Sequence, residues 1–197
     1  MNSFAQSVAI LAGLSFAPYA TAAGPAAATN HYFGASYYQN STEFTTPAGN
    51  VAADLDNFIF SYGWIFLPHL SIEGRAGLSA AKSSTNTTSS VTYDAVNDSM
   101  YGVFLRGSLP VASQNITLYG LIGLSSASNT YSITSLTSSK SYTTSATGLS
   151  YGVGAELFGT PSTSFHLEWM KYLSATDMTS KGFLVGVTHH FSMPKLW

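Results

Sequence analysis

Apolar and polar side chains alternate along eight segments between residues 31 and 191. A period of two is the pattern of β-strands that have two different faces. Each segment is about ten residues long, which is the length that a tilted strand needs to cross a bilayer. The pattern therefore predicts strands over residues 31–39, 56–66, 70–79, 100–109, 116–125, 149–158, 165–172 and 182–191.

The segments between these strands are alternately short and long. The short ones each contain a proline and span residues 67–69, 110–115 and 159–164. The long ones are rich in Ser, Thr and Asn and span residues 40–55, 80–99, 126–148 and 173–181. Membrane barrels alternate tight periplasmic turns with longer extracellular loops, and the spacing predicts the same arrangement here. Parts of the long segments, such as 130–133 and 141–144, can continue as strands above the membrane.

The two faces of these segments indicate what surrounds them. Within residues 56–66 one face is aromatic, with Phe60 and Trp64, and the other is small and polar, with Ser61 and Gly63. Only 8% of the residues are charged, against roughly 25% in soluble domains. Charged residues share a face with glycines, which fits a crowded lumen. We therefore predict an all-β fold, a closed eight-stranded antiparallel up-and-down transmembrane β-barrel with its apolar face in lipid.

Five charged residues fall on the face predicted to line the lumen. Eight strands leave an interior that side chains just fill, so we expect an internal structural network rather than a conduction path. The five residues are Glu73, Arg75, Arg106, Glu156 and Glu168.

The prolines also predict the register of neighbouring strands. Turns centred on Pro68 and Pro161, and a third centred between Ala112 and Ser113, place inward positions opposite inward positions, which a one-residue slip would destroy. The predicted pairs are Arg75 with Ser61, Glu73 with Gly63, Arg106 with Tyr119, and Glu156 with His166.

Aromatic residues stand near the ends of the predicted strands. Such residues form girdles at the two membrane interfaces of a barrel. They are Tyr37, Tyr101, Tyr151 and Phe183 near the long segments, and Phe66, Phe158, Phe165 and Phe191 near the short ones.

Residues 1–23 have the features of a signal peptide. An apolar run over residues 8–16 is followed by Ala20-Thr21-Ala22, a small-x-small cleavage pattern, although the start of the chain has no Lys or Arg. The alternative is a retained N-terminal helix, whose apolar run is too short to span a bilayer. We expect a short segment over residues 24–30, the barrel over 31–191 and a C-terminal extension over 192–197.

Few residues indicate a chemical site. His189 and His190 are adjacent and point to opposite faces of a strand, while His166 and His190 share the lumen face without a third ligand. There is no cysteine, and no Ser, His and acid stand in a recognisable catalytic pattern. We expect no metal, no cofactor and no enzyme activity. A net charge of −2 argues against nucleic acid as a partner.

The chain resembles the OmpA/OmpX-like outer-membrane β-barrels of Gram-negative bacteria. The resemblance rests on residues 62–74 (YGWIFLPHLSIEG), 118–123 (LYGLIG) and 151–156 (YGVGAE), and on a final strand that ends at Phe191. It implies an integral outer-membrane protein with both termini in the periplasm. In this family a terminal aromatic residue resembles an assembly signal, and either Phe191 or Trp197 can take that part because residues 192–197 follow the last strand.

The resemblance and the loops together predict a structural or interaction protein with long extracellular loops for surface recognition or adhesion. The first alternative is a narrow, porin-like channel for ions or small solutes, and a less favoured one is a lipid-modifying enzyme. The expected partners are outer-membrane lipid, the barrel-assembly machinery in transit and an unidentified extracellular ligand.

Overall fold

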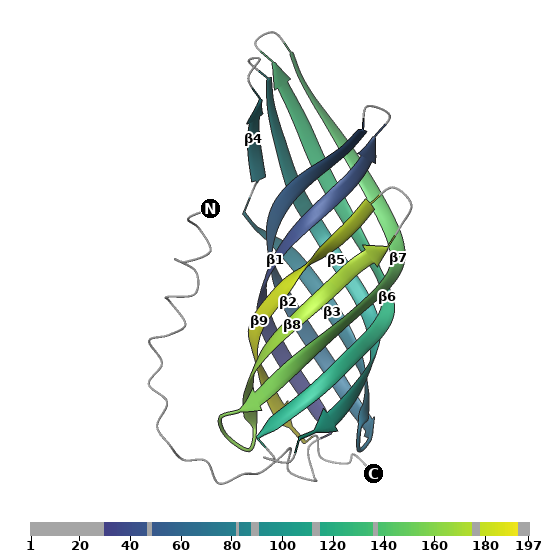
Figure 1. The fold of residues 1–197 in the computed structure, drawn as a ribbon, viewed down its shortest axis with the longest axis vertical. Helices are drawn as coiled ribbons and strands as arrows, with labels where there is room; N and C mark the ends of the chain where they lie inside the picture. The colour runs from purple at the N-terminus through teal and green to yellow at the C-terminus, as the bar shows by residue number, and fades with distance from the viewer. Residues whose placement is uncertain are drawn as a thin grey trace.

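The computed structural model describes residues 30–46, 49–81, 83–87, 91–111, 115–135, 138–174 and 178–192. Within these ranges the chain is almost entirely β-strand (Figure 1), and it has no helix that is long and apolar enough to cross a membrane. The strands are β1 (His31–Thr46), β2 (Gly49–Leu67), β3 (Leu70–Ala81), β4 (Ser83–Thr87), β5 (Val91–Pro110), β6 (Ile116–Ser135), β7 (Ser138–Phe158), β8 (Thr163–Ser174) and β9 (Met178–Phe191).

Eight of these strands close into a barrel. Their order is β3-β2-β1-β9-β8-β7-β6-β5, every neighbouring pair is antiparallel, and β3 also pairs with β5. Strand β4 pairs only with β5 and is not part of the closed ring. All eight predicted strands lie within the barrel strands, so the predicted closed eight-stranded fold is confirmed.

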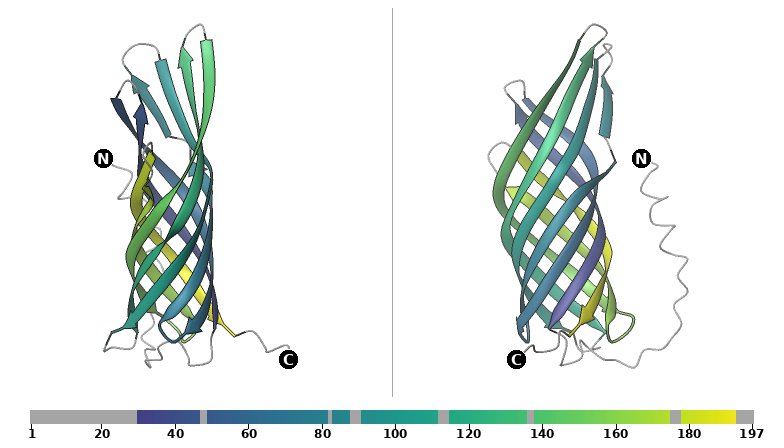
Figure 2. Two further views of the ribbon diagram at one scale, coloured as in Figure 1. Left: turned by 90° about the vertical axis from the view of Figure 1, so that its right-hand side faces the viewer. Right: turned by 180° about the vertical axis from the view of Figure 1, so that it is seen from behind.

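Four of the hairpins extend the strands further than the sequence pattern predicted. The long segments are mostly paired strand rather than loop, since β1 pairs with β2 up to Thr46 and Gly49, and β6 pairs with β7 up to Ser135 and Ser138. Figure 2 shows these hairpins rising beyond the ring of strands. We call this the extended end of the barrel. The opposite end, where β2 meets β3, β5 meets β6 and β7 meets β8, is the turn end.

Paired hydroxyl groups explain why the β6–β7 hairpin stays regular. Serines and threonines hydrogen-bond directly across the two strands, and such cross-strand pairs stabilise a sheet. Residues 130–133 and 141–144 therefore continue as strand, as the sequence allowed. The pairs are Ser126–Thr147 at 3.0 Å, Ser128–Ser145 at 3.3 Å, Thr130–Thr143 at 2.9 Å and Ser132–Ser141 at 2.8 Å between oxygens.

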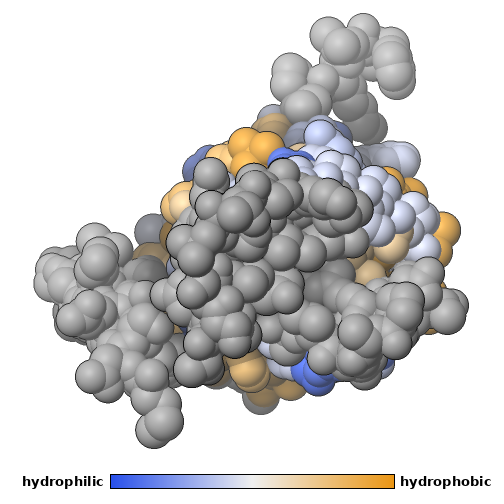
Figure 3. All heavy atoms as spheres, turned by 90° about the horizontal axis from the view of Figure 1, so that it is seen from above, coloured by the Kyte–Doolittle hydropathy of each residue, from blue (hydrophilic) through white to orange (hydrophobic). Residues whose placement is uncertain are grey.

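The outer wall of the barrel is apolar. Large hydrophobic side chains that point outward are 37–70% exposed, which suits lipid rather than water as the surrounding solvent. Viewed from above, apolar residues lie around the outer wall (Figure 3). They include Phe58, Phe60, Trp64, Ile72, Leu78, Val103, Leu105, Leu118, Ile122, Leu124, Leu149, Val153, Leu167 and Phe183.

Three of the four predicted cross-strand pairs are confirmed. Arg75 lies opposite Ser61, Glu73 opposite Gly63, and Glu156 opposite His166. The fourth is wrong, because Arg106 lies opposite Leu121 rather than Tyr119. The last β5–β6 pair is Pro110 with Thr117, so this turn is centred one residue later than predicted. A shift of two positions in pairing leaves every side chain on its predicted face.

A β-bulge near the end of β8 turns two consecutive side chains into the barrel. Leu173 has a φ of 56°, a left-handed conformation that is unfavourable for a branched side chain. As a result Tyr172 and Leu173 are both fully buried. The backbone N–H of Leu173 donates a hydrogen bond to Ser150 Oγ at 3.1 Å, which holds the bulge against β7.

This bulge predicts an unusual ranking of two substitutions. Both Leu173→Ala and Leu173→Gly remove the buried side chain, but only Ala keeps a Cβ atom in the left-handed conformation. We expect Leu173→Gly to be more stable than Leu173→Ala by about 1 kcal/mol, measured by urea titration of the refolded protein in lipid. Leu184, equally buried in β9, is the matched control, and there Gly should be the worse residue. The same order at both sites would contradict the strained bulge.

Candidate functional site

The interior of the barrel contains all five charged residues that the sequence assigned to the lumen. Each is at most 9% exposed, so the alternation of side chains predicted their inward orientation correctly. An isolated charge in such a position is costly, so each must be paired. The five residues come from four strands: Glu73 and Arg75 from β3, Arg106 from β5, Glu156 from β7, and Glu168 from β8.

These side chains form one continuous chain of ion pairs. Arg75 binds Glu168 through two hydrogen bonds, at 2.6 and 2.8 Å, and its Nε lies 2.5 Å from Glu73. The other carboxylate oxygen of Glu73 lies 3.6 Å from Arg106 Nη1. Acidic and basic groups therefore alternate along the lumen.

The chain of ion pairs ends at a histidine near the turn end. Arg106 Nη2 lies 2.5 Å from Glu156 Oε2, and His190 Nε2 lies 2.9 Å from Glu156 Oε1. The sequence placed His190 on the lumen face but did not predict its role as the last member of this chain. It adds a sixth group to an alternating series that has three carboxylates and two guanidinium groups.

Aromatic rings enclose the two arginines. The guanidinium of Arg106 lies 3.8 Å from the ring centre of Tyr119 and 5.2 Å from that of Tyr32. Arg75 lies 5.2 Å from the ring of Phe104 and 5.9 Å from the ring of Tyr172. Contacts of this kind attract a cation to the face of the ring and are stronger where water is excluded.

The tyrosine hydroxyls also complete the hydrogen bonds of the carboxylates. Tyr32 donates to Glu73 at 2.6 Å, and Tyr119 donates to Glu168 at 3.0 Å. The sequence placed Tyr119 only as the inward position opposite Arg106, and it indicated no role for Tyr32. Both stand at inward positions of the period-two pattern, so the alternation of side chains was the signal that could have identified them.

Two glycines make room for these rings. A Cβ atom added to Gly63 would collide with the ring of Tyr32, and one added to Gly154 would come within 2.6 Å of the ring of Tyr119. The prediction that glycines share the charged face because the lumen is crowded is therefore confirmed.

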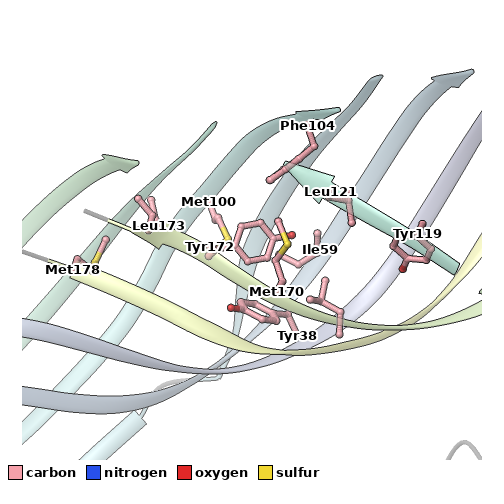
Figure 4. Packing of buried hydrophobic residues seen from close by; sticks show 12 residues of the cluster. Tyr38, Ile59, Met100, Phe104, Tyr119, Leu121, Met170, Tyr172, Leu173 and Met178 are labelled. Carbon is pink, nitrogen blue, oxygen red and sulfur yellow. The ribbon is translucent and has the colours of Figure 1, made fainter. Parts of the chain in front are cut away.

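Beyond the ion pairs, towards the extended end, apolar side chains form a buried cluster in the interior. Tyr172 on β8 contacts the ring of Tyr38 on β1 at 5.1 Å and that of Phe104 on β5 at 5.9 Å between centres, so aromatic rings meet across the lumen. Figure 4 shows Tyr38, Met170 and Tyr172 together in this cluster. The cluster also contains Ile59, Met100, Leu121, Leu173, Met178 and Leu184.

Seven of the eight predicted interfacial aromatics lie at least partly exposed. Tyr101 and Phe183 are the most exposed, at 57% and 58%, and the others on the wall are Tyr37, Phe66, Tyr151, Phe165 and Phe191. Phe158 is the exception and corrects the prediction. It is 7% exposed and packs inside on the ring of His190, 5.2 Å away. Its neighbour Leu157 occupies the outward position, so being near a strand end does not by itself place an aromatic residue in a girdle.

The histidines in the lumen bind other side chains. His166 contacts Ser36 through Nε2 at 2.9 Å and Thr188 through Nδ1 at 3.1 Å. His189 points outward and contacts Thr163 at 3.2 Å. Among the side chains that the structure describes, no group of three or more His, Cys, Asp or Glu residues could hold a metal ion. The absence of a metal site stays a prediction.

Ser164, Glu156 and His190 are the residue types of a catalytic triad, but their arrangement differs from one. In a triad the imidazole lies between the hydroxyl and the carboxylate. Here the hydroxyl of Ser164 and Nε2 of His190 both bind the same atom, Glu156 Oε1. The hydroxyl therefore donates to the carboxylate and is not activated by the imidazole.

Comparison with known proteins agrees with this geometry. A family model described as "Outer membrane protein beta-barrel domain" matches residues 7–191. The chain belongs to this outer-membrane β-barrel family. The match places the protein in an outer membrane. No curated protein sequence matches the chain.

Several solved structures share the fold of this outer-membrane barrel. The attachment invasion locus protein Ail of Yersinia pestis is 18% identical with a TM-score of 0.56, over 83% of this chain and 99% of that one. Neisserial surface protein A is 14% identical with a TM-score of 0.53, over 83% and 99%. OprG of Pseudomonas aeruginosa is 7% identical with a TM-score of 0.51, over 84% and 98%. At these identities the likeness is one of fold.

The chain of ion pairs predicts the effect of removing Arg106, the guanidinium group between Glu73 and Glu156. Arg106→Ala leaves Glu156 without its guanidinium partner and should destabilise the barrel by about 3–5 kcal/mol, the usual cost of breaking a buried pair. The measurement is urea unfolding of the refolded protein in lipid. Val103→Ala is the matched control on the same strand, and it should cost less because lipid can fill the space left by a 62% exposed side chain.

A second variant separates the stranded charge from lost packing. Adding Glu156→Gln to Arg106→Ala removes the uncompensated carboxylate, so the double variant should recover part of the lost stability. Equal stability of Arg106→Ala and Val103→Ala would show that the lumen charges do not support one another.

Proposed function

We propose that the protein is a structural and interaction protein of the outer membrane, whose extended end is a surface for recognition or adhesion. The observation that carries this proposal is the closed interior, where rings from β1, β5 and β8 meet across the lumen above the ion pairs. A barrel filled in this way has its accessible surface at its ends rather than along a central path.

The boundary between the apolar wall and the hydroxyl pairs supports a surface role for the β6–β7 hairpin. The outward side chains Leu124 and Leu149 are 62% and 47% exposed, and they belong to the apolar wall. The next outward positions are Ser126 and Thr147, where the paired hydroxyls begin. Hydrocarbon does not favour such hydroxyl groups, so this boundary fits the upper limit of the bilayer and leaves the rest of the hairpin in water.

The chemistry of the hairpin indicates the kind of contact that it would make. Its described outward side chains on β6 and β7 are Ser and Thr, which donate and accept hydrogen bonds without net charge. Recognition through such a surface rests on hydrogen bonds and shape rather than on charge. Attachment, after which the Yersinia pestis protein is named, is an activity of this kind.

We also propose an orientation, with the extended end outside the cell and the turn end in the periplasm. The proposal rests on the short connections of the turn end and the long hairpins of the extended end, the asymmetry typical of bacterial outer-membrane barrels. Catalysis is not part of the proposed function, because Ser164 and His190 share one carboxylate oxygen instead of contacting each other.

Conductance and binding measurements separate the proposed function from its main alternative. The refolded protein should give no stable single-channel current in a planar bilayer. Cells that express it should bind at least one member of a panel of immobilised glycans and extracellular-matrix proteins. The control replaces residues 126–147 by a two-residue turn, which should abolish binding while the barrel still runs as a compact band in cold SDS. A stable conductance without binding would favour the channel.

The orientation has its own test. An epitope inserted at Ser138 or Ser84 should be labelled by antibody on intact cells, whereas an epitope at Pro68 or Pro161 should be labelled only after the outer membrane is permeabilised. Ser138, Pro68 and Pro161 are at a hairpin tip or in turns, and Ser84 is in β4, outside the closed ring, so insertions at these sites disturb the barrel least. Labelling of Pro68 or Pro161 on intact cells would invert the proposed orientation.

A further inference from the structure

A small cavity lies at the turn end of the barrel, next to the last members of the ion-pair chain. Its volume is about 50 Å³, and its walls come from Tyr32 on β1, Pro68 in the β2–β3 turn, Arg106 on β5, Thr117 on β6 and His190 on β9. To hold a water molecule, a site needs room for one sphere of the size of water and two to four polar partners. The cavity is therefore large enough for one or a few water molecules and too small for an organic ligand.

Three residues that line this cavity each have a buried polar atom that makes no hydrogen bond to another protein atom. These atoms are Arg106 Nε, Thr117 Oγ1 and His190 Nδ1. Each of these residues is at most 6% exposed. A buried polar group without a partner is costly, so three of them around one cavity point to a ligand that satisfies them together.

The chemistry of the three atoms identifies the class of ligand. Arg106 Nε can only donate a hydrogen bond. His190 Nε2 faces a carboxylate oxygen at 2.9 Å and so donates its proton there, which leaves Nδ1 for the ligand, as an acceptor in an imidazole or as a donor in an imidazolium. The hydroxyl of Thr117 can do either. Because water both donates and accepts, a single water molecule satisfies a guanidinium N–H, a hydroxyl and a ring nitrogen of either role, with about three hydrogen bonds.

Charged ligands suit the cavity less well. An anion would lie beside the carboxylate of Glu156, which already contacts both Arg106 and His190. A cation would face the N–H of a guanidinium group. A neutral molecule avoids both repulsions.

We propose that Arg106 Nε, Thr117 Oγ1 and His190 Nδ1 bind one ordered water molecule. This water continues the ion-pair chain beyond His190 towards the solvent at the turn end. The inference is independent of the proposed recognition function, since it concerns the opposite end of the barrel.

The direction in which one substitution changes the stability of the barrel tests this site. Thr117→Val keeps the shape of the side chain and removes only its hydroxyl. If the hydroxyl binds water, the variant loses a hydrogen bond, and its urea midpoint should fall below that of the parent protein in lipid. If the hydroxyl has no partner, its removal relieves a buried unsatisfied group, and the midpoint should rise.

Thr188→Val is the matched control. Thr188 is also a buried threonine of the lumen, and it has a known partner, His166 Nδ1 at 3.1 Å. Its replacement should lower the midpoint. A fall at both positions supports the proposal, and a fall at Thr188 with a rise at Thr117 overturns it.

A crystal structure of the unaltered protein grown with sodium bromide gives a second readout that does not depend on any variant folding. Electron density for one water within hydrogen-bond distance of all three atoms supports the site. An anomalous bromide peak in the cavity would overturn the proposal in favour of an anion site. A cavity without density would overturn it as well.

Discussion

Every backbone N–H and C=O group that lies among hydrocarbon must find its partner within the chain, because the core of a bilayer offers no water. A sheet meets this requirement only when it closes, and here the pairing of β3 with β5 completes a ring of eight strands. Eight strands fix a narrow interior, so the side chains that point inward must fill it and satisfy one another. The ion pairs, the aromatic rings around the arginines and the glycines that face those rings all follow from this geometry.

Two different solutions fill the two parts of the interior. Near the turn end, alternating charges neutralise one another, and tyrosine hydroxyls donate further hydrogen bonds to the carboxylates. Towards the extended end, methionine, leucine and aromatic side chains pack without charge. Tyr172 joins the two parts, because its hydroxyl accepts a hydrogen bond from Arg75 at 2.7 Å while its ring packs against Tyr38 and Phe104. A single side chain thereby links the ionic and the apolar halves.

The sequence predicts the face of each side chain well and the distances between remote residues poorly. A period of two determines which residues point inward, and it correctly placed Glu73, Arg75 and Glu168 in the lumen. Turn centres determine register only to within a residue, which is why the partner of Arg106 was misplaced by two positions. Hydroxyl pairs such as Thr130 with Thr143 stabilise the strands above the membrane, and composition alone allowed this continuation without showing how far it extends. The contact of His190 with Glu156 joins residues 34 positions apart, and no local pattern encodes it.

The ion-pair chain has a consequence for the order in which the barrel can be assembled. Arg75 is on the third strand of the ring in sequence, and its bidentate partner Glu168 is 93 residues later, on the seventh. Arg106 similarly depends on Glu156, 50 residues further along the chain. A nascent sheet made of β1 to β5 would contain both guanidinium groups of the ion-pair chain but only one of its three carboxylates, Glu73. The C-terminal strands are therefore needed to neutralise the arginines of the N-terminal half, because an unpaired guanidinium group is costly away from water.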